Sequence, residues 1–239
     1  MNFLVTGGAS GLGASIVNTL AASGTDTVYF TYSKSAAAAK EIETTHQNAH
    51  GFFCDFTDAV SLISFLEQMP GLDIDVLVNN AHGSINKEHF YKTEASRFLE
   101  SYEQNVVPVL QITQEAIKTF RKKKSGKIIT ILSSYIINKP PTGLSAYVAN
   151  KAYLLSMSKS WASEYIRFNI TSNCISPSFM LTGLTNDTDE RILDQMLQEH
   201  PLKKLLTTGE VANAVLYLAN APQHINGINL VMNAGVDLI

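Results

Sequence analysis

The feature of this sequence that most constrains its fold is the alternation of short β-branched runs with longer amphipathic stretches. Such alternation is typical of repeated strand–helix units, because neighbouring parallel strands need a crossover helix between them. Helices are expected near residues 12–23, 35–47, 58–69, 93–120, 145–168, 187–199 and 209–219. Seven strands are expected, at Asn2–Thr6, Thr27–Thr31, Gly51–Cys54, Val76–Asn79, Lys127–Ser133, Ile170–Ile175 and Ile228–Val231.

No repeat, low-complexity linker or domain boundary interrupts this pattern. A chain of 239 residues, 45% of them hydrophobic, is long enough to bury one sizeable core. The sequence therefore predicts one α/β domain over residues 1–239, with a doubly wound parallel sheet of about seven strands and helices on both faces.

Charge and hydropathy exclude several classes of protein. The net charge of −3 lacks the basic excess of nucleic-acid binders, so no nucleic-acid partner is expected. No apolar run approaches the 18 or so residues of a spanning helix, and an apolar strand at Asn2 leaves no room for a signal peptide, so we expect a cytoplasmic protein with no membrane partner. Cys54 and Cys174 lie in apolar runs and are expected to be buried free thiols.

The helix starts and one long insertion can be placed from the sequence. Thr57-Asp58, Ser145 and Thr208 are expected N-caps. The interval from Ser176 to about Thr208 lacks a strand, and an insertion after a strand's carboxyl end in an open α/β sheet lies over the ligand crevice. Residues 178–207 are therefore a candidate lid.

A glycine-rich turn follows the first expected strand, in the sequence TGGASGLG from Thr6 to Gly13. Glycines at a strand–helix turn allow a tight bend and close approach of the backbone to a pyrophosphate, whose charge the free N–H groups of the helix start attract. The pattern favours a dinucleotide site over an ordinary strand–helix turn.

Several motifs together resemble the short-chain dehydrogenase/reductase family. They are TGxxxGxG at residues 6–13, Asn79-Asn80-Ala81, Asn105, Ser134 and the run Tyr147 to Lys151, in the family's order over nearly the whole chain. The resemblance implies a Rossmann-type fold and an oxidoreductase, with a cofactor-binding half over about residues 1–125 and a catalytic half over about residues 126–239.

Tyr147 and Lys151 carry the predicted chemistry. They are four apart on an expected helix, so both side chains leave one face in successive turns. An ammonium about 4 Å away, at an effective dielectric near 20, supplies roughly 4 kcal/mol, or about three pKa units, so we expect Lys151 to lower the pKa of the phenol. Tyr147 would then donate a proton to a carbonyl oxygen as hydride arrives from a nicotinamide, or take one from an alcohol.

The resemblance supplies two further catalytic residues. Ser134 lies thirteen residues before Tyr147, the usual family spacing, and would hydrogen-bond the same substrate oxygen. Counting forward from Gly126 selects Ser133 instead, and Ser134 is the preferred prediction. The family asparagine that helps hold a water relay to the lysine corresponds to Asn105.

The end of the second expected strand carries TYSKS, Thr31 to Ser35, with no acidic residue. An aspartate there accepts hydrogen bonds from the adenosine ribose and repels a 2′-phosphate. Tyr32, Ser33 and Lys34 offer instead a cation and a hydroxyl that suit a phosphate, which predicts NADP(H) as cofactor. The alternative is that Lys34 points to solvent and selectivity is weak.

Further cofactor contacts are predicted along the chain. Asp55-Phe56 resembles the family's adenine contact, and Pro177 to Thr182 resembles the stretch that holds the nicotinamide carboxamide. The cofactor-binding residues are predicted to be Gly7, Ser10, Gly11, Leu12, Gly13, Tyr32, Ser33, Lys34, Asp55, Phe56, Asn79, Ala81, Tyr147, Lys151, Pro177 and Thr182.

Several features depart from the family or suggest other roles. His82 and Ser178 replace common family glycines, and His82 either packs locally or contacts substrate. His46 and His50 have helical metal-ligand spacing but no third ligand, so no metal is expected. The basic run Arg121 to Lys124 is either a solvated helix end or a docking patch for an acidic acyl carrier protein.

The resemblance to 3-oxoacyl-carrier-protein reductases makes a 3-oxoacyl thioester, on an acyl carrier protein, the leading substrate. A sugar, polyol or other small ketone is the alternative, and a non-catalytic dinucleotide-binding sensor or structural subunit is a third hypothesis. Family members commonly form homodimers or homotetramers, for which Leu154, Leu155, Met157 and Trp161 are a candidate surface, although their apolar spacing fits the core equally well.

Overall fold

The computed structural model describes residues 1–137, 139–183, 185 and 188–236. These residues form a seven-stranded sheet, entirely parallel, in the order β3-β2-β1-β4-β5-β6-β7. Its strands are β1 (Asn2–Val5), β2 (Thr27–Tyr32), β3 (Ala49–Phe53), β4 (Val76–Asn79), β5 (Gly126–Ile131), β6 (Ile170–Pro177) and β7 (Asn229–Met232). The prediction of a doubly wound parallel α/β fold is confirmed.

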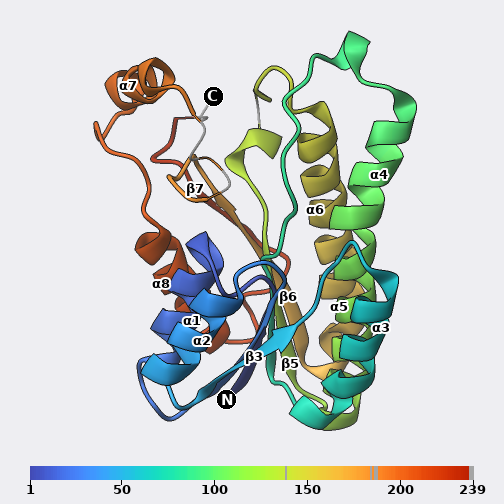
Figure 1. The fold of residues 1–239 in the computed structure, drawn as a ribbon. Coiled ribbons are helices and arrows are strands. Elements are labelled where there is room, and N and C mark those ends of the chain that lie inside the picture. Colours follow the sequence, from blue (N-terminus) through green and yellow to red (C-terminus); the bar gives the residue numbers. More distant parts are fainter. Residues whose placement is uncertain (138, 184, 186–187, 237–239) are drawn as a thin grey trace.

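Helices cover both faces of the sheet (Figure 1). One face carries α1 (Gly11–Ala21), α2 (Ala36–Thr45) and α8 (Thr208–Asn220). The other face carries α3 (Ala59–Gln68), α4 (Ala95–Asn105), α5 (Val107–Lys123) and α6 (Ser145–Tyr165). The remaining helix, α7 (Glu190–Glu199), rises above the sheet, and short 3-10 turns η1 (Met69–Leu72), η2 (Phe90–Lys92), η3 (Ser134–Ile136) and η4 (Ile166–Phe168) complete the described elements.

Strand β1 shows how the two cores form. Phe3 and Val5 are fully buried against α1, α2 and α8, whereas Leu4 between them is fully buried against the α3–α5–α6 side. Because side chains alternate along a strand, a parallel strand covered on both faces reads as one continuous apolar run. The run Phe3-Leu4-Val5 thus places β1 at the centre of the sheet.

The long helix expected over residues 93–120 is divided in two. Helix α4 ends at Asn105 and α5 begins at Val107, with Val106 (φ −111°, ψ −51°) between them. Pro108 near the start of α5 explains the break, because proline has no N–H to donate and its ring clashes with the preceding turn. The prediction of one unbroken helix is wrong.

The N-cap predictions have mixed outcomes. Asp58 caps α3, accepting a hydrogen bond from the Val60 N–H. Thr207, not Thr208, caps α8 and forms a capping box with Glu210. Ser145 is the first residue of α6 and Leu144 precedes it, so that cap prediction is also wrong.

The strand order locates the ligand crevice. The chain winds outward from β1 through β2 to β3, then returns to place β4 on the other side of β1. Ligands of open α/β sheets bind at such a switch point, beyond the carboxyl ends of the strands. The glycine-rich turn after β1 and the loop after β4 both lie there.

Both cysteines, Cys54 and Cys174, are buried free thiols, as predicted. Burial raises their pKa to about 12 and about 11 respectively, so both are protonated at neutral pH. Within the part of the chain that the structure describes, no helix is long and apolar enough to cross a bilayer.

Candidate active site

The glycine-rich turn is held closely against the second strand. The Gly7 N–H donates to Thr31 Oγ1 (3.0 Å), and the Gly8 N–H donates to the Thr31 carbonyl (2.8 Å). Gly7 and Gly11 have positive φ (66° and 52°), and a Cβ at Gly8 would lie 2.5 Å from Phe30 Cβ. The turn therefore needs glycine at these positions for conformation or for space.

The start of α1 is open to an anion. Ser10 is the N-cap but its side chain makes no capping hydrogen bond, and the first turn holds no acidic residue. Thr182 lies over this helix start, since a Cβ at Gly11 would be 3.4 Å from Thr182 Cβ. Two predicted cofactor residues more than 170 positions apart in the sequence are thus brought together, beside a helix start whose dipole favours negative charge.

Asn80, which the sequence analysis did not select, links the glycine-rich turn to β4. Its Nδ2 donates to the Thr6 carbonyl (2.9 Å), while Thr6 Oγ1 accepts from the backbone N–H groups of Asn80 (2.9 Å) and Ala81 (3.0 Å). Asn79, the residue selected instead, is buried and donates to Thr113 Oγ1 on α5 (3.0 Å). The signal for Asn80 was its adjacency to Asn79 in the same motif.

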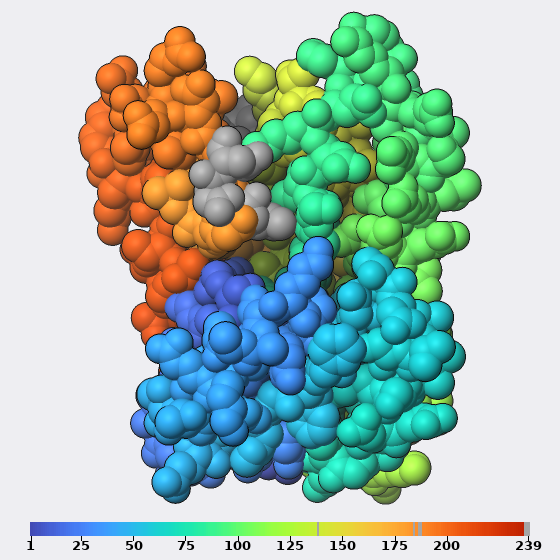
Figure 2. Space-filling view, in the orientation of Figure 1, coloured from blue at the N-terminus to red at the C-terminus, as the bar shows by residue number. Residues whose placement is uncertain are grey.

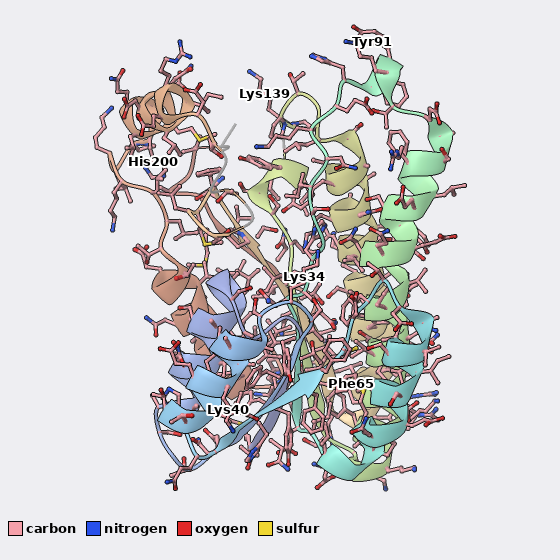
Figure 3. The ribbon with its side chains drawn as sticks, in the orientation of Figure 1. Lys34, Lys40, Phe65, Tyr91, Lys139 and His200 are labelled. Atoms are coloured by element: carbon pink, nitrogen blue, oxygen red, sulfur yellow. The ribbon has the colours of Figure 1, made fainter. Side chains whose placement is uncertain are left out.

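The end of β2 presents the residues that were expected to face the adenosine. Tyr32 is half-buried and packs edge-to-face on Phe53 (centroids 6.1 Å apart), while Ser33 and Lys34 are exposed at the carboxyl edge of the sheet (Figure 3). Hydrogen bonds from Thr57 lower the pKa of Asp55, and the charge of Lys34 lowers it further. Lys34 and Asp55 therefore face the same space, with Phe56 packed beneath, against the core on the α3–α6 side.

Tyr147 meets Ser133 rather than Ser134. A side-chain hydrogen bond with Ser133 lowers the pKa of Tyr147. Strand β5 ends at Ile131, and Ser133 caps the turn η3, accepting from the Tyr135 N–H (3.3 Å). Ser134 is buried as the first residue of that turn. The structure thus brings to Tyr147 the serine that counting forward from Gly126 selects, and Ser133 replaces the preferred Ser134 in the function proposed below.

Lys151 lies fully inside the protein one turn beyond Tyr147. Its Nζ donates to the Ile131 carbonyl (2.8 Å) and lies 5.8 Å from the centre of the Tyr147 ring. Burial lowers the pKa of Lys151 from 10.5 to about 8, with Cys174 acting weakly in the opposite sense. The lysine is thus held near the tyrosine at the carboxyl end of β5.

The pKa of Tyr147 moves in the direction opposite to the sequence-based expectation. Burial raises it, and the Ser133 hydrogen bond only partly opposes that rise. Desolvation disfavours the phenolate, and the ammonium of Lys151 is itself desolvated and bonded to the Ile131 carbonyl. Tyr147 is accordingly protonated at neutral pH, the form that donates a proton.

Asn105 lies beside this pair, but both ends of its side chain are engaged. Its Oδ1 accepts from the Gly83 N–H (2.7 Å), and its Nδ2 donates to the Ser101 carbonyl (2.9 Å). The same carbonyl and the Ser101 hydroxyl accept from Asn150 Nδ2 on α6 (3.1 and 3.0 Å). Asn105 therefore ties the loop after β4 to α4 and, through Ser101, to the helix that carries Tyr147.

His82 packs against Tyr147. The two rings are 5.0 Å apart in an edge-to-face arrangement, and His82 Nδ1 lies 2.8 Å from the Gly83 carbonyl oxygen. Burial and the charge of Lys151 lower the pKa of His82 to about 3, so the ring is neutral. Its Nε2 is buried and has no hydrogen-bond partner among the described residues.

A cavity of about 610 Å³ opens beside Tyr147 and His82. Its walls come from the loop after β4, from α4 and from the start of α6, which are green and yellow in Figure 2. A backbone hydrogen bond from Glu88 to Gly143 (3.0 Å) joins two of these walls. Most of the lining side chains are polar, among them Ser84, Asn86, Lys87, Thr93, Arg97, Glu100, Ser101 and Gln104.

The candidate lid contains α7, whose described residues are all at least partly exposed. Ser178, which follows Pro177 at the end of β6, donates its N–H to the Met232 carbonyl (2.9 Å) and so anchors the segment to β7. Residues 184, 186 and 187 of the segment lie outside the described residues, and its role as a lid stays a prediction. Within the described ranges, no group of three metal-ligating side chains comes together.

A glycine-rich turn at the switch point of a doubly wound parallel sheet, with a serine, a tyrosine and a lysine converging beside it, defines an oxidoreductase of the Rossmann-type fold. The chain belongs to the short-chain dehydrogenase family, whose sequence model matches residues 2–192. It is similar to the 3-oxoacyl-[acyl-carrier-protein] reductase FabG of Escherichia coli K12, at 31% identity over 100% of both chains. The reductase MabA of Mycobacterium bovis is 31% identical, over 98% of this chain and 92% of its own.

Solved structures agree with the fold. A short chain dehydrogenase/reductase family protein superposes with a TM-score of 0.87 at 28% identity, over 99% of this chain and 97% of its own. A protein assigned as an NAD(P)-dependent gluconate 5-dehydrogenase from Beutenbergia cavernae, with NADP bound at low occupancy, gives a TM-score of 0.89 at 23% identity, over 98% and 95% of the two chains. The second likeness concerns the fold alone.

Proposed function

We propose that this protein is an NADP(H)-dependent oxidoreductase that interconverts a carbonyl group and a secondary alcohol. The observation that carries the proposal is the convergence of Ser133 and Lys151 on Tyr147, which itself lines the cavity described above. Membership of the short-chain dehydrogenase family supports the same reaction.

The residues present fit a dinucleotide. The tight turn from Gly7 to Gly13 leads into the start of α1, where the N-cap Ser10 makes no side-chain capping hydrogen bond and no acidic residue lies in the first turn, which suits a pyrophosphate. Ser10, Gly11, Leu12 and Thr182 would hold this part, and Tyr32, Ser33, Lys34 and Asp55 the adenosine. When bound, the nicotinamide supplies or accepts the hydride.

The chain's own residues handle the proton and the substrate oxygen. Ser133 and Tyr147 would both hydrogen-bond the carbonyl oxygen, fixing its position and stabilising the negative charge that develops there. Tyr147, protonated at neutral pH, donates its proton to that oxygen during reduction and recovers it during alcohol oxidation. Lys151, with a pKa of about 8, can resupply a proton near working pH.

The preference for NADP(H) rests on Ser33 and Lys34. Both are exposed at the end of β2, and residues 31–35 carry no carboxylate of their own that would repel a 2′-phosphate. Asp55 lies near enough to Lys34 for the charge of the lysine to lower the pKa of its carboxyl.

A 3-oxoacyl thioester is the first candidate substrate, because the FabG and MabA relatives that match nearly the whole chain are 3-oxoacyl-carrier-protein reductases. The basic run Arg121 to Lys124 does not support carrier docking. Lys123 is paired with Asp73 (3.2 Å) and Asp75 (2.5 Å) just before β4, at the amino edge of the sheet, opposite the catalytic residues. A carrier protein would have to dock at the cavity mouth instead.

A small hydroxylated ketone, such as a sugar or polyol derivative, is the second candidate. The cavity beside Tyr147 favours it, because its lining is mostly polar and contains both charges of the Arg97–Glu100 ion pair (3.0 Å). A long apolar chain would desolvate these groups without offering them a hydrogen bond. A short acyl group on a polar carrier arm remains compatible with the same lining.

The test is a fluorescence titration with NADPH and NADH, followed by a carbonyl panel that contains acetoacetyl thioesters and hydroxylated ketones. We expect tighter binding of NADPH, and a loss of at least tenfold in NADPH affinity but little in NADH affinity for Lys34→Glu. Equal affinities in the wild type would contradict the role of Lys34. NADPH binding with no turnover across the panel would favour the sensor hypothesis.

Two further predictions concern the assembly and its location. Leu154 and Trp161 are buried in the core, so they cannot supply the proposed contact surface, and Leu155 and Met157 are partly buried against the same core. A homodimer or homotetramer through other residues of the outer helices stays a prediction, as does a cytoplasmic location.

A further inference from the structure

A closed series of hydrogen bonds and one ring contact surrounds Tyr147. His82 Nδ1 bonds the Gly83 carbonyl, the Gly83 N–H bonds Asn105, and Asn105 bonds Ser101 on α4. Ser101 in turn accepts from Asn150 on α6, three residues beyond Tyr147, whose ring packs back on His82. Three separate parts of the chain are thereby fixed around one side chain.

These contacts determine the orientation and the tautomer of the His82 ring. The Gly83 carbonyl oxygen only accepts, so Nδ1 carries the ring proton and Nε2 carries the lone pair. That buried Nε2 has no partner among the described residues, which is unfavourable for stability. Because Nε2 makes no hydrogen bond, what His82 contributes to Tyr147 is the ring itself, through the edge-to-face contact.

We propose that His82 is a positioning residue for Tyr147, its oriented neutral ring fixing the phenol and excluding water from it. The inference rests on the proposed oxidoreductase function. An edge-to-face pair adds a stabilising contact beyond simple burial, and it restricts the phenol to the geometry in which proton transfer is efficient. His82 stands where the family commonly has glycine, which could not supply this contact.

Other titratable groups around Tyr147 and His82 also contribute to the pH dependence of the site. Tyr135 from η3 raises the pKa of Tyr147, Cys174 from β6 faces Lys151, and Arg97 and Glu100 on α4 line the cavity. None of them changes in a His82 variant. Loss of the ring should admit water, which moves the pKa of Tyr147 down toward its ordinary value and that of Lys151 up toward 10.5.

The experiment compares His82→Ala, His82→Phe and the matched control His89→Ala, whose ring packs on Tyr91 outside the cavity. We expect His82→Ala to lower kcat about tenfold with little change in KM, and to shift the acid limb of the kcat/KM profile for alcohol oxidation to lower pH. His82→Phe should keep kcat within about threefold of wild type, and His89→Ala should leave kcat and the profile unchanged.

A second readout does not depend on turnover. Tyrosinate absorbance, taken as the difference between each protein and the same protein carrying Tyr147→Phe, isolates the titration of Tyr147, which should occur at lower pH in His82→Ala. Wild-type kcat and an unshifted titration in His82→Ala would overturn the proposal. So would a loss of activity with an unshifted profile and no recovery in His82→Phe. Absence of turnover in the wild type with a shifted titration would count against the proposed function and not against the role of His82.

Discussion

The Cα of Gly13 faces the carbonyl oxygen of Gly7 so closely that a Cβ at residue 13 would lie 1.9 Å from that oxygen. The first turn of α1 is therefore pressed directly onto the turn that precedes it. Asn80 Nδ2, which donates to the Thr6 carbonyl, would lie 2.7 Å from the same added atom. The hydrogen bond that joins the segments after β1 and β4 therefore also limits the space at residue 13. Any side chain at residue 13 must move one of these backbone segments.

Gly13→Ala should therefore lower both stability and NADPH affinity, because the displaced turn can no longer follow the pyrophosphate. We expect a destabilisation of about 1–3 kcal/mol and at least a tenfold weaker NADPH complex. Gly209→Ala is the matched control, since nothing lies within 4 Å of a Cβ there and the residue is inside α8. Denaturant unfolding and NADPH titration of both variants check this, and equal behaviour of the two would contradict it.

Ser133→Ala should lower kcat by about 10²–10³-fold, the usual effect of losing one donor to a developing oxyanion. Ser134→Ala, at the neighbouring buried position, should change kcat far less. Steady-state reduction assays on the two variants give the comparison. A larger effect at Ser134 would restore the assignment made from sequence spacing and remove the one made from the structure.

Thr207→Ala should destabilise the protein by about 1 kcal/mol, because the Thr207 hydroxyl accepts from the Glu210 N–H (3.2 Å) at the start of α8. Thr208→Ala should change stability by only a few tenths of a kcal/mol, since it is inside the helix rather than at its cap. Urea unfolding of the pair distinguishes the two positions. The reverse order would mean that α8 begins one residue later.

Lys151→Met should abolish activity yet stabilise the protein at neutral pH. The pKa of Lys151 in the folded state is about 8, below its ordinary 10.5, so the folded state carries the full cost of a buried charge below pH 8 and loses that cost as the pH rises toward 10.5. After allowance for the lost Ile131 hydrogen bond, the gain at pH 7 should be on the order of 1 kcal/mol.

Unfolding free energies of wild type and Lys151→Met, measured at pH 7 and pH 9.5, test the direction of this effect. The amount by which the unfolding free energy of Lys151→Met exceeds that of wild type should shrink at the higher pH, because the wild-type lysine is then largely neutral in the folded state. An advantage that grows with pH would show that burial does not lower the pKa of Lys151.

The fold could be predicted from the sequence because its signals are local and repeated. Runs such as Phe3-Leu4-Val5 identify strands buried on both faces, and amphipathic intervals of helical length identify the crossovers. The break at Val106 was missed although Pro108 is visible in the sequence, because the helical periodicity continues across it. The turn glycines and the Tyr147–Lys151 pair were found because each depends only on short spacing.

The parts of the site that could not be predicted depend on contacts between distant segments. Whether Ser133 or Ser134 faces Tyr147 depends on whether the extra residue is accommodated before or after the serine, which the spacings from Gly126 and to Tyr147 do not decide. Asn79 and Asn80 are adjacent in one motif, yet only the packing of α5 shows that Asn79 turns to Thr113. The upward shift in the pKa of Tyr147 follows from burial, which no local pattern reveals.

The central claim is that Tyr147 transfers the proton in an NADPH-dependent carbonyl reduction, and the most direct test follows NADPH oxidation by wild type and by Tyr147→Phe with the best substrate from the carbonyl panel. We expect measurable wild-type turnover and a loss of at least about 10²-fold in Tyr147→Phe with NADPH affinity nearly unchanged. A Tyr147→Phe variant that keeps full reductase activity would contradict it.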